Sequence, residues 1–335
     1  MTKQSKQSRR RKKLFLAILM ILFTGVLLTT STYAWFTANR TVTVEQIDVT
    51  VAAMNGLQIS VDAVNWKPTI TNEDILGAKA GAYGAAANQI PAGSNSAPVS
   101  TVGAIDGTTG YMNMYAGAIE TADGQYILTT EQSVETNGDT GKFVAFDLFF
   151  STTSQTTIYL TNSSNVVYTS GPSGLENSAR IAFVKQGNVA AGAGFEAAQA
   201  LKASNSVTPI IWEPNYDTHT DAAVQNAYNT YNITTSTTGA AELDYVGVKA
   251  PISADLNIPV NSKSETYFQA VNPAIQTPKS GIPTSAFQQV FVLEPGITKY
   301  RIYMWIEGQD VDCENNASGG SISYNLQFSM NSSAS

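Results

Sequence analysis

Apolar and polar residues alternate at period two along several stretches of the chain, a pattern that predicts β-strands. The clearest instance is 321–330, where every second residue is large and apolar and the others are serine, asparagine or glutamine. Such a stretch is typical of an antiparallel strand with one buried and one wet face. The predicted buried face consists of Ile322, Tyr324, Leu326, Phe328 and Met330.

A second alternating stretch, 298–307, predicts another strand of the same kind. We expect its apolar face in the core and its other face, with Lys299, Arg301 and Glu307, in solvent. The stretch 142–151 is apolar on nearly both faces, which is typical of a central strand. Shorter candidate strands are 57–61, 156–161, 180–184 and 288–293.

Helical patterns are scarce, since only 194–203 and 221–228 could form two or three turns. Short strands separated by turn residues favour an all-β fold. We expect an antiparallel jelly-roll or Greek-key β-sandwich with long inserted loops and one or two short helices. A single domain over 35–335 would carry insertions at about 66–140 and 187–284, where large apolar residues are sparse.

The first 34 residues have the layout of an export signal, with seven basic residues before an uncharged apolar run. Thr32 and Ala34 are small enough for the −3 and −1 positions of a signal peptidase site, so that Trp35 would begin the mature chain. A competing interpretation is an uncleaved signal-anchor, because 14–34 is long enough to span a bilayer. Either way we expect an extracellular or cell-surface protein that meets the membrane only through this leader.

The composition of the chain excludes several classes of function. Residues 35–335 hold 12 basic and 26 acidic residues, a net charge of −14 that disfavours nucleic acid as a partner. One cysteine excludes a disulfide within the chain, and one histidine excludes a metal centre built on several histidines. His219 lies in a polar stretch, and we expect it in a solvated loop. The sequence therefore predicts a protein that is not an enzyme.

The densest acidic run is 307–316, and its oxygen ligands could hold a hard cation such as calcium. The alternative is a solvated turn between the last two strands, since the spacing does not match an EF-hand. Apart from this ion we expect no cofactor. The candidate ligands are Glu307, Asp310, Asp312 and Glu314.

A set of aromatic residues keeps a second function class open, a monomeric surface module that binds glycans or a host ligand. The same residues could equally pack in the core or in loops. They are Tyr111, Tyr115, Trp212, Tyr216, Tyr228 and Tyr231.

The stretch 41–51 alternates, but its phase breaks at Gln46 and Ile47. The simpler interpretation is a β-bulge in an ordinary first strand. The functional interpretation is an extended N-terminal segment that leaves its own domain and completes the sheet of a neighbour, as in β-strand addition.

The leader junction, Tyr33-Ala34-Trp35-Phe36-Thr37, is followed by a β segment that ends near Asn55-Gly56-Leu57-Gln58-Ile59. Together with a C-terminal run at 305–313, this resembles the camelysin/TasA-like exported proteins of Gram-positive bacteria. The resemblance covers about the first sixty residues and the last fifty.

The resemblance implies a secreted fibre subunit of the cell surface or biofilm matrix, released by a signal peptidase and polymerising with itself by donor-strand exchange. The donor would run from Trp35 through Val51. The residues expected to carry it are Trp35, Phe36, Val42, Val44, Ile47, Val49 and Val51.

Overall fold

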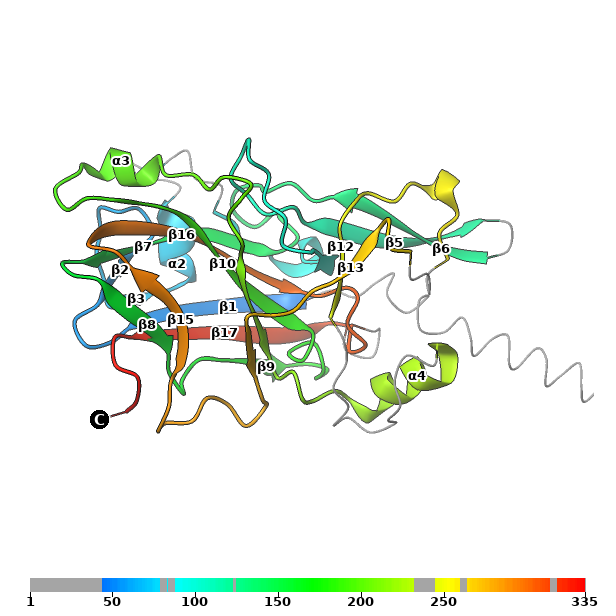
Figure 1. The fold of residues 1–335 in the computed structure, drawn as a ribbon. Coiled ribbons are helices and arrows are strands. Elements are labelled where there is room, and N and C mark those ends of the chain that lie inside the picture. The colour runs from blue at the N-terminus through cyan, green and yellow to red at the C-terminus, as the bar shows by residue number, and fades with distance from the viewer. Residues whose placement is uncertain are drawn as a thin grey trace, which may run out of the picture.

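The structure is a computed structural model that describes residues 44–78, 83, 88–122, 125–231, 245–259, 264–313 and 318–334. Most of these residues lie in strands and connecting loops (Figure 1). Several residues singled out in the sequence lie outside the described part: Thr32, Ala34, Trp35, Phe36, Val42 and Glu314.

Two six-stranded sheets pack face to face, which confirms the predicted all-β sandwich. The first sheet has the order β15-β8-β17-β1-β3, with β9 also paired to β17. Its strands are β1 (Val44–Ala53), β3 (Thr69–Ile70), β8 (Thr156–Leu160), β9 (Asn165–Ser170), β15 (Gln288–Leu293) and β17 (Gly320–Ser329).

The second sheet has the order β14-β11-β10-β16-β7-β2. Two pairs in the sandwich are parallel, β1 with β17 and β11 with β14, while the remaining described pairs within both sheets are antiparallel. The strands are β2 (Gln58–Ser60), β7 (Val144–Thr152), β10 (Ala179–Val189), β11 (Ile210–Pro214), β14 (Ile275–Thr277) and β16 (Gly296–Ile306).

The core between the sheets is built from the alternating apolar residues of both. The face predicted for β17 is buried from Ile322 to Phe328, and β7 is buried on both faces, as the sequence indicated. Aromatic rings fill the middle: Phe291 stacks on Tyr300 with ring centroids 4.2 Å apart, and Phe150 meets Phe328 edge-on at 5.3 Å. Offset and edge-on pairs of this kind stabilise a core beyond the area they bury.

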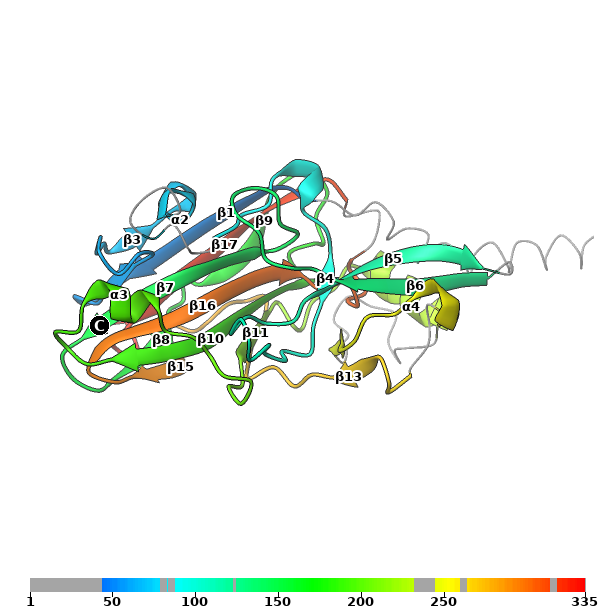
Figure 2. The same cartoon turned by 90° about the horizontal axis from the view of Figure 1, so that it is seen from above.

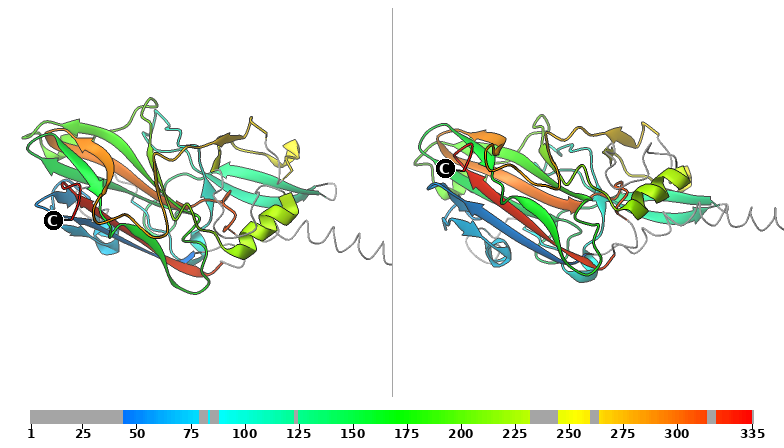
Figure 3. Two further views of the ribbon diagram at one scale, coloured as in Figure 1. Left: turned by 60° about the horizontal axis from the view of Figure 1, so that its bottom comes forward. Right: turned by 90° about the horizontal axis from the view of Figure 1, so that it is seen from below.

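A third layer covers the outer face of the second sheet (Figure 2). A three-stranded sheet, β4-β5-β6, begins over the end of β16 and extends past the end of the sandwich where β1 begins. Figure 3 shows the same hairpin and the nearby α4 from two other sides. The elements outside the two main sheets are α2 (Asn72–Ala78), η2 (Gly93–Asn95), β4 (Val99–Ser100), β5 (Tyr115–Ala122), β6 (Gln125–Gln132), α3 (Phe195–Gln199), α4 (Asp221–Tyr231), β12 (Val246–Val248), η3 (Ala254–Leu256) and β13 (Phe268–Ala270).

The structure corrects two expectations from the sequence. The stretch 187–284 is not an insertion throughout, because β11 and β14 belong to the second sheet. The face of β16 expected in solvent is buried: Lys299 is 6% exposed and Arg301 is fully buried. The expectation of a wet face was wrong because the third layer covers it.

A buried ionic network forms where the outer face of β16 meets the third layer. Arg301 pairs with Glu135, which follows β6, and with Asp147 of β7, from which its Nη1 lies 2.9 Å. Asp147 also accepts a hydrogen bond from the Tyr83 hydroxyl and pairs with Lys299 at 3.2 Å. Burial by itself raises the pKa of Asp147, but Arg301 and Lys299 outweigh it and hold that pKa below its usual value.

Candidate functional site

Strand β1 contains the described half of the predicted donor segment and lies in the sheet of its own chain. Val44, Ile47, Val49 and Val51 are all buried there. The register between β1 and β17 shifts between Val44 and Ile47, at the place where the phase breaks in the sequence. The sequence break therefore corresponds to a bulge, which returns the apolar residues to the core.

Both edges of β1 have partners, but of different kinds. One edge pairs with β17 along the whole strand, in parallel. The other edge pairs with β3 only at Val51 and Ala52. On this second edge, before the residues that pair with β3, the side chain of Asn72 accepts a hydrogen bond from the Val49 N–H at 2.8 Å and donates one to the Ile47 carbonyl at 3.1 Å. The amide thus takes the place of a neighbouring strand.

The chain enters the sandwich at one end. Val44 pairs with Gly320, the first residue of β17, so β1 starts beside the acidic loop that follows β16. Nine residues, 35–43, separate the predicted cleavage site from this point.

The described carboxylates of the acidic run are buried rather than solvated, which corrects the turn interpretation. Asp310 is 8% exposed and Asp312 is 1% exposed. An oxygen of Asp310 lies 2.8 Å from Nη2 of Arg180, a residue of β10 that also pairs with Glu213 of β11. Arg180 therefore ties the loop to the second sheet.

His219 is buried as well, so its expected place in a solvated loop was wrong. Its Nδ1 lies 2.7 Å from Asp312, whose other oxygen accepts a hydrogen bond from the N–H of Thr220 at the start of α4. Burial alone would lower the pKa of His219, but the hydrogen bond to Asp312 and the charge of Asp310 raise it above its usual value. This contact joins α4 to the sandwich.

One ligand atom from each of His219, Asp310 and Asp312 lies within 4.8 Å of the others, close enough to share a cation. Protein donors already bond to these oxygens: Arg180 bonds to Asp310, and His219 and the Thr220 N–H bond to Asp312. Calcium binding at this loop stays a prediction. The contacts that the structure describes there, from Asp312 to His219 and to the Thr220 N–H, hold α4 against the sandwich.

Glu307, at the start of the loop, is also fully buried. It accepts hydrogen bonds from Nε1 of Trp305 at 3.0 Å and from the N–H of Gln309 at 3.1 Å. Burial raises its pKa to about 7, because the charged form loses its hydration.

This shift gives a pH-dependent prediction. Between the usual pKa of 4.5 and about 7 the folded chain binds more protons at Glu307 than the unfolded chain, so stability falls as pH rises through that window. Glu307→Gln removes the charge and is expected to increase the free energy of unfolding at pH 8 by up to about 3 kcal/mol, at ~1.36 kcal/mol per pKa unit. At pH 4.5 we expect little change. Urea denaturation of both proteins at the two pH values measures the difference. The exposed Glu131→Gln serves as the control, and an equal gain from it at pH 8 would contradict this explanation.

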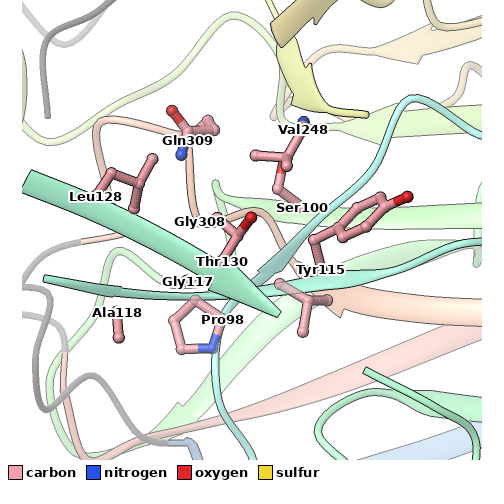
Figure 4. A pocket seen from close by; sticks show the side chains of 11 residues that line it. Pro98, Ser100, Tyr115, Gly117, Ala118, Leu128, Thr130, Val248, Gly308 and Gln309 are labelled. Carbon is pink, nitrogen blue, oxygen red and sulfur yellow. The ribbon is translucent and has the colours of Figure 1, made fainter. Parts of the chain in front are cut away.

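A cavity of about 40 Å³ lies next to this loop, between β4, the β5–β6 hairpin and β12 (Figure 4). It has room for water but is far smaller than the pockets of about 300–1,000 Å³ that hold small organic ligands. Three of the aromatic residues considered for glycan binding have structural positions: Trp212 is fully buried, Tyr115 is buried, and Tyr111 lies over Arg301, whereas Tyr228 is 39% exposed.

Comparisons with family models, with curated proteins and with solved structures each find no match for this chain. Among the residues that the structure describes, none of the helices is both long enough and apolar enough to cross a membrane.

Proposed function

We propose that the chain is an exported structural subunit that forms fibres on the cell surface or in a biofilm matrix. Cleavage after Ala34 frees the segment 35–43, which then adds as a strand to the next copy. The observation that carries the proposal is the position of Val44, where the chain joins the end of its sandwich directly after this segment. An extended segment at a free N-terminus can supply backbone hydrogen bonds to an open sheet edge.

The start of β1 at Val44 divides the stretch from Trp35 to Val51 into two parts. Ile47, Val49 and Val51 fill the core of their own chain. Removing large aliphatic side chains from a core costs about 2–5 kcal/mol each, so exchanging these residues would weaken the donor subunit. The donor is therefore the part before Val44, which is itself buried in its own chain, and β1 anchors it.

A deletion of residues 35–43 tests the proposal. We expect the shortened chain to fold, because the described core begins at Val44, and to form no fibres by negative-stain electron microscopy. A chain in which the nine residues are replaced by glycine and serine keeps the length and serves as the matched control. It is also expected to form none, since it lacks the aromatic and β-branched side chains. Fibres of normal abundance from both variants would rule out residues 35–43 as the donor. An unmodified chain that forms no fibres after cleavage would favour the monomeric binding module.

A further inference from the structure

One side of the sandwich has an unpaired strand edge. β16 pairs with β10 as far as Val189, but on the opposite edge β11 pairs with β10 only from Ile181 to Phe183. Among the described residues, 184–189 therefore have no strand beside them on that edge. Unpaired backbone groups of this kind are a template for another extended segment.

A cleft of about 480 Å³ lies along this edge, between β10 and the segment 202–210. Its inner wall includes Phe183 and Tyr300, which belong to the aromatic core, and Phe291 of β15 stacks on Tyr300. β15 is itself the edge strand of the first sheet, so both sheets end on this side. The residues that shape the cleft include Phe183, Lys185, Gly187, Lys202, Val207 and Tyr300.

We propose that this cleft is the acceptor for residues 35–43 of a second copy of the chain. The inference rests on the proposed function and adds the place where the donor binds. It also gives the fibre a direction, because the donor and the acceptor lie at different ends of each subunit.

The chemistry of the cleft fits this segment. The free edge of β10 can pair with an extended backbone, which the Thr/Val-rich part of 35–43 favours. Phe183 and Tyr300 form an apolar base to the cleft but are 0% and 2% exposed, so Trp35 and Phe36 would gain mainly apolar burial there. Lys185 and Lys202 line the same cleft. The ammonium of Lys202 already bonds to the Thr108 carbonyl at 2.8 Å, so Lys185 is the cation proposed to meet an aromatic face, a contact worth about 0.5–1 kcal/mol at an exposed site.

The geometry favours binding between copies rather than within one. The first residue of β10, Ala179, pairs with Ile306 beside the acidic loop, at the end where β1 begins, whereas Gly187 pairs with Lys299 toward the other end (Figure 1). Eight residues of strand cover about 27 Å, at ~3.4 Å per residue. Nine extended residues span about 30 Å. To reach the cleft of its own subunit, the segment 35–43 would need nearly its whole length to cover the distance along β10. It would then have no residues left to pass around the edge of the sandwich. In a neighbouring subunit stacked end to end, the cleft lies next to the end from which the segment 35–43 leaves, so the segment can reach it directly.

Cysteine cross-linking tests the contact. The single native cysteine, Cys313, is fully buried, so introduced thiols at exposed positions react selectively. One population of the exported chain carries Thr37→Cys and the other carries Thr208→Cys at the cleft. The two are mixed during assembly and treated with a short bis-maleimide. The matched acceptor control is Thr169→Cys, also an exposed threonine, on β9 of the other sheet.

We expect a cross-linked dimer of Thr37→Cys with Thr208→Cys chains at least ten times more abundant than with Thr169→Cys chains. If fibres form but the two yields are equal, or the control yield is higher, the acceptor assignment is wrong and the fibre function stands. If the unmodified chain forms no fibres after cleavage, the proposed function fails and this inference fails with it.

Discussion

Replacing Arg301 with methionine is expected to destabilise the chain by about 3–5 kcal/mol, because it removes the cation that two buried carboxylates share. Arg301 is fully buried, and Glu135 and Asp147 have side chains about 3% exposed. Burial raises the pKa of Glu135, and without Arg301 both acids must take up a proton or remain charged without this partner. Equilibrium unfolding in urea at pH 7 measures the loss.

The control for this substitution is Lys67→Met. Lys67 pairs with Asp74, but its side chain is 48% exposed, and surface pairs contribute about 0–1 kcal/mol. We also expect the Arg301→Met protein to lose less stability at pH 4 than at pH 7, since protonation of Glu135 relieves the buried charge. A loss at pH 7 no larger than that of Lys67→Met would show that the network does not hold the third layer on the sandwich.

Blocking the leader junction is expected to abolish fibres altogether. Ala34→Lys places a long charged side chain at the position that must be small for signal peptidase, so residues 1–34 should stay attached. The segment 35–43 would then have no free end, and the apolar run would hold the chain at the membrane. Intact-mass measurement shows whether the leader is retained, and electron microscopy of the culture shows whether fibres are present.

Ala17→Leu is the matched control for that experiment, because it alters the apolar run without touching the junction. Its leader should be removed and its fibres should be normal. Normal fibres built from Ala34→Lys chains that keep residues 1–34 would rule out a free N-terminal strand as the connecting element.

The alternation of apolar and polar residues was sufficient to predict most strands of the sandwich. It did not predict the third layer that covers the outer face of the second sheet. β16 and β17 have the same period-two pattern, yet β16 is buried throughout from Thr298 to Ile306, whereas β17 keeps partly exposed residues between its buried ones. The difference comes from the third layer, whose segments are poor in large apolar residues and distant in the sequence. Burial of Lys299 and Arg301 depends on Asp147 and Glu135, and no local pattern indicates such partners.

The candidate site was predictable to a similar extent. The phase break at Gln46 and Ile47 correctly marked the bulge, because register is a local property of a strand. The roles of Asn72 and His219 were not visible, since each depends on a partner brought near by the fold. The bond from His219 to Asp312 joins residues 93 positions apart. A lone histidine in a polar stretch carries no signal for such a contact.

The central claim is that the freed N-terminal segment of one subunit connects it to the next. Electron cryo-microscopy of assembled fibres tests it directly, at a resolution that traces the chain from Trp35 into β1. The account predicts that residues 35–43 leave their own sandwich beside Gly320 and run along the edge of β10 in the neighbouring subunit. A map in which this segment folds back onto its own sandwich, while other surfaces join the subunits, would contradict it.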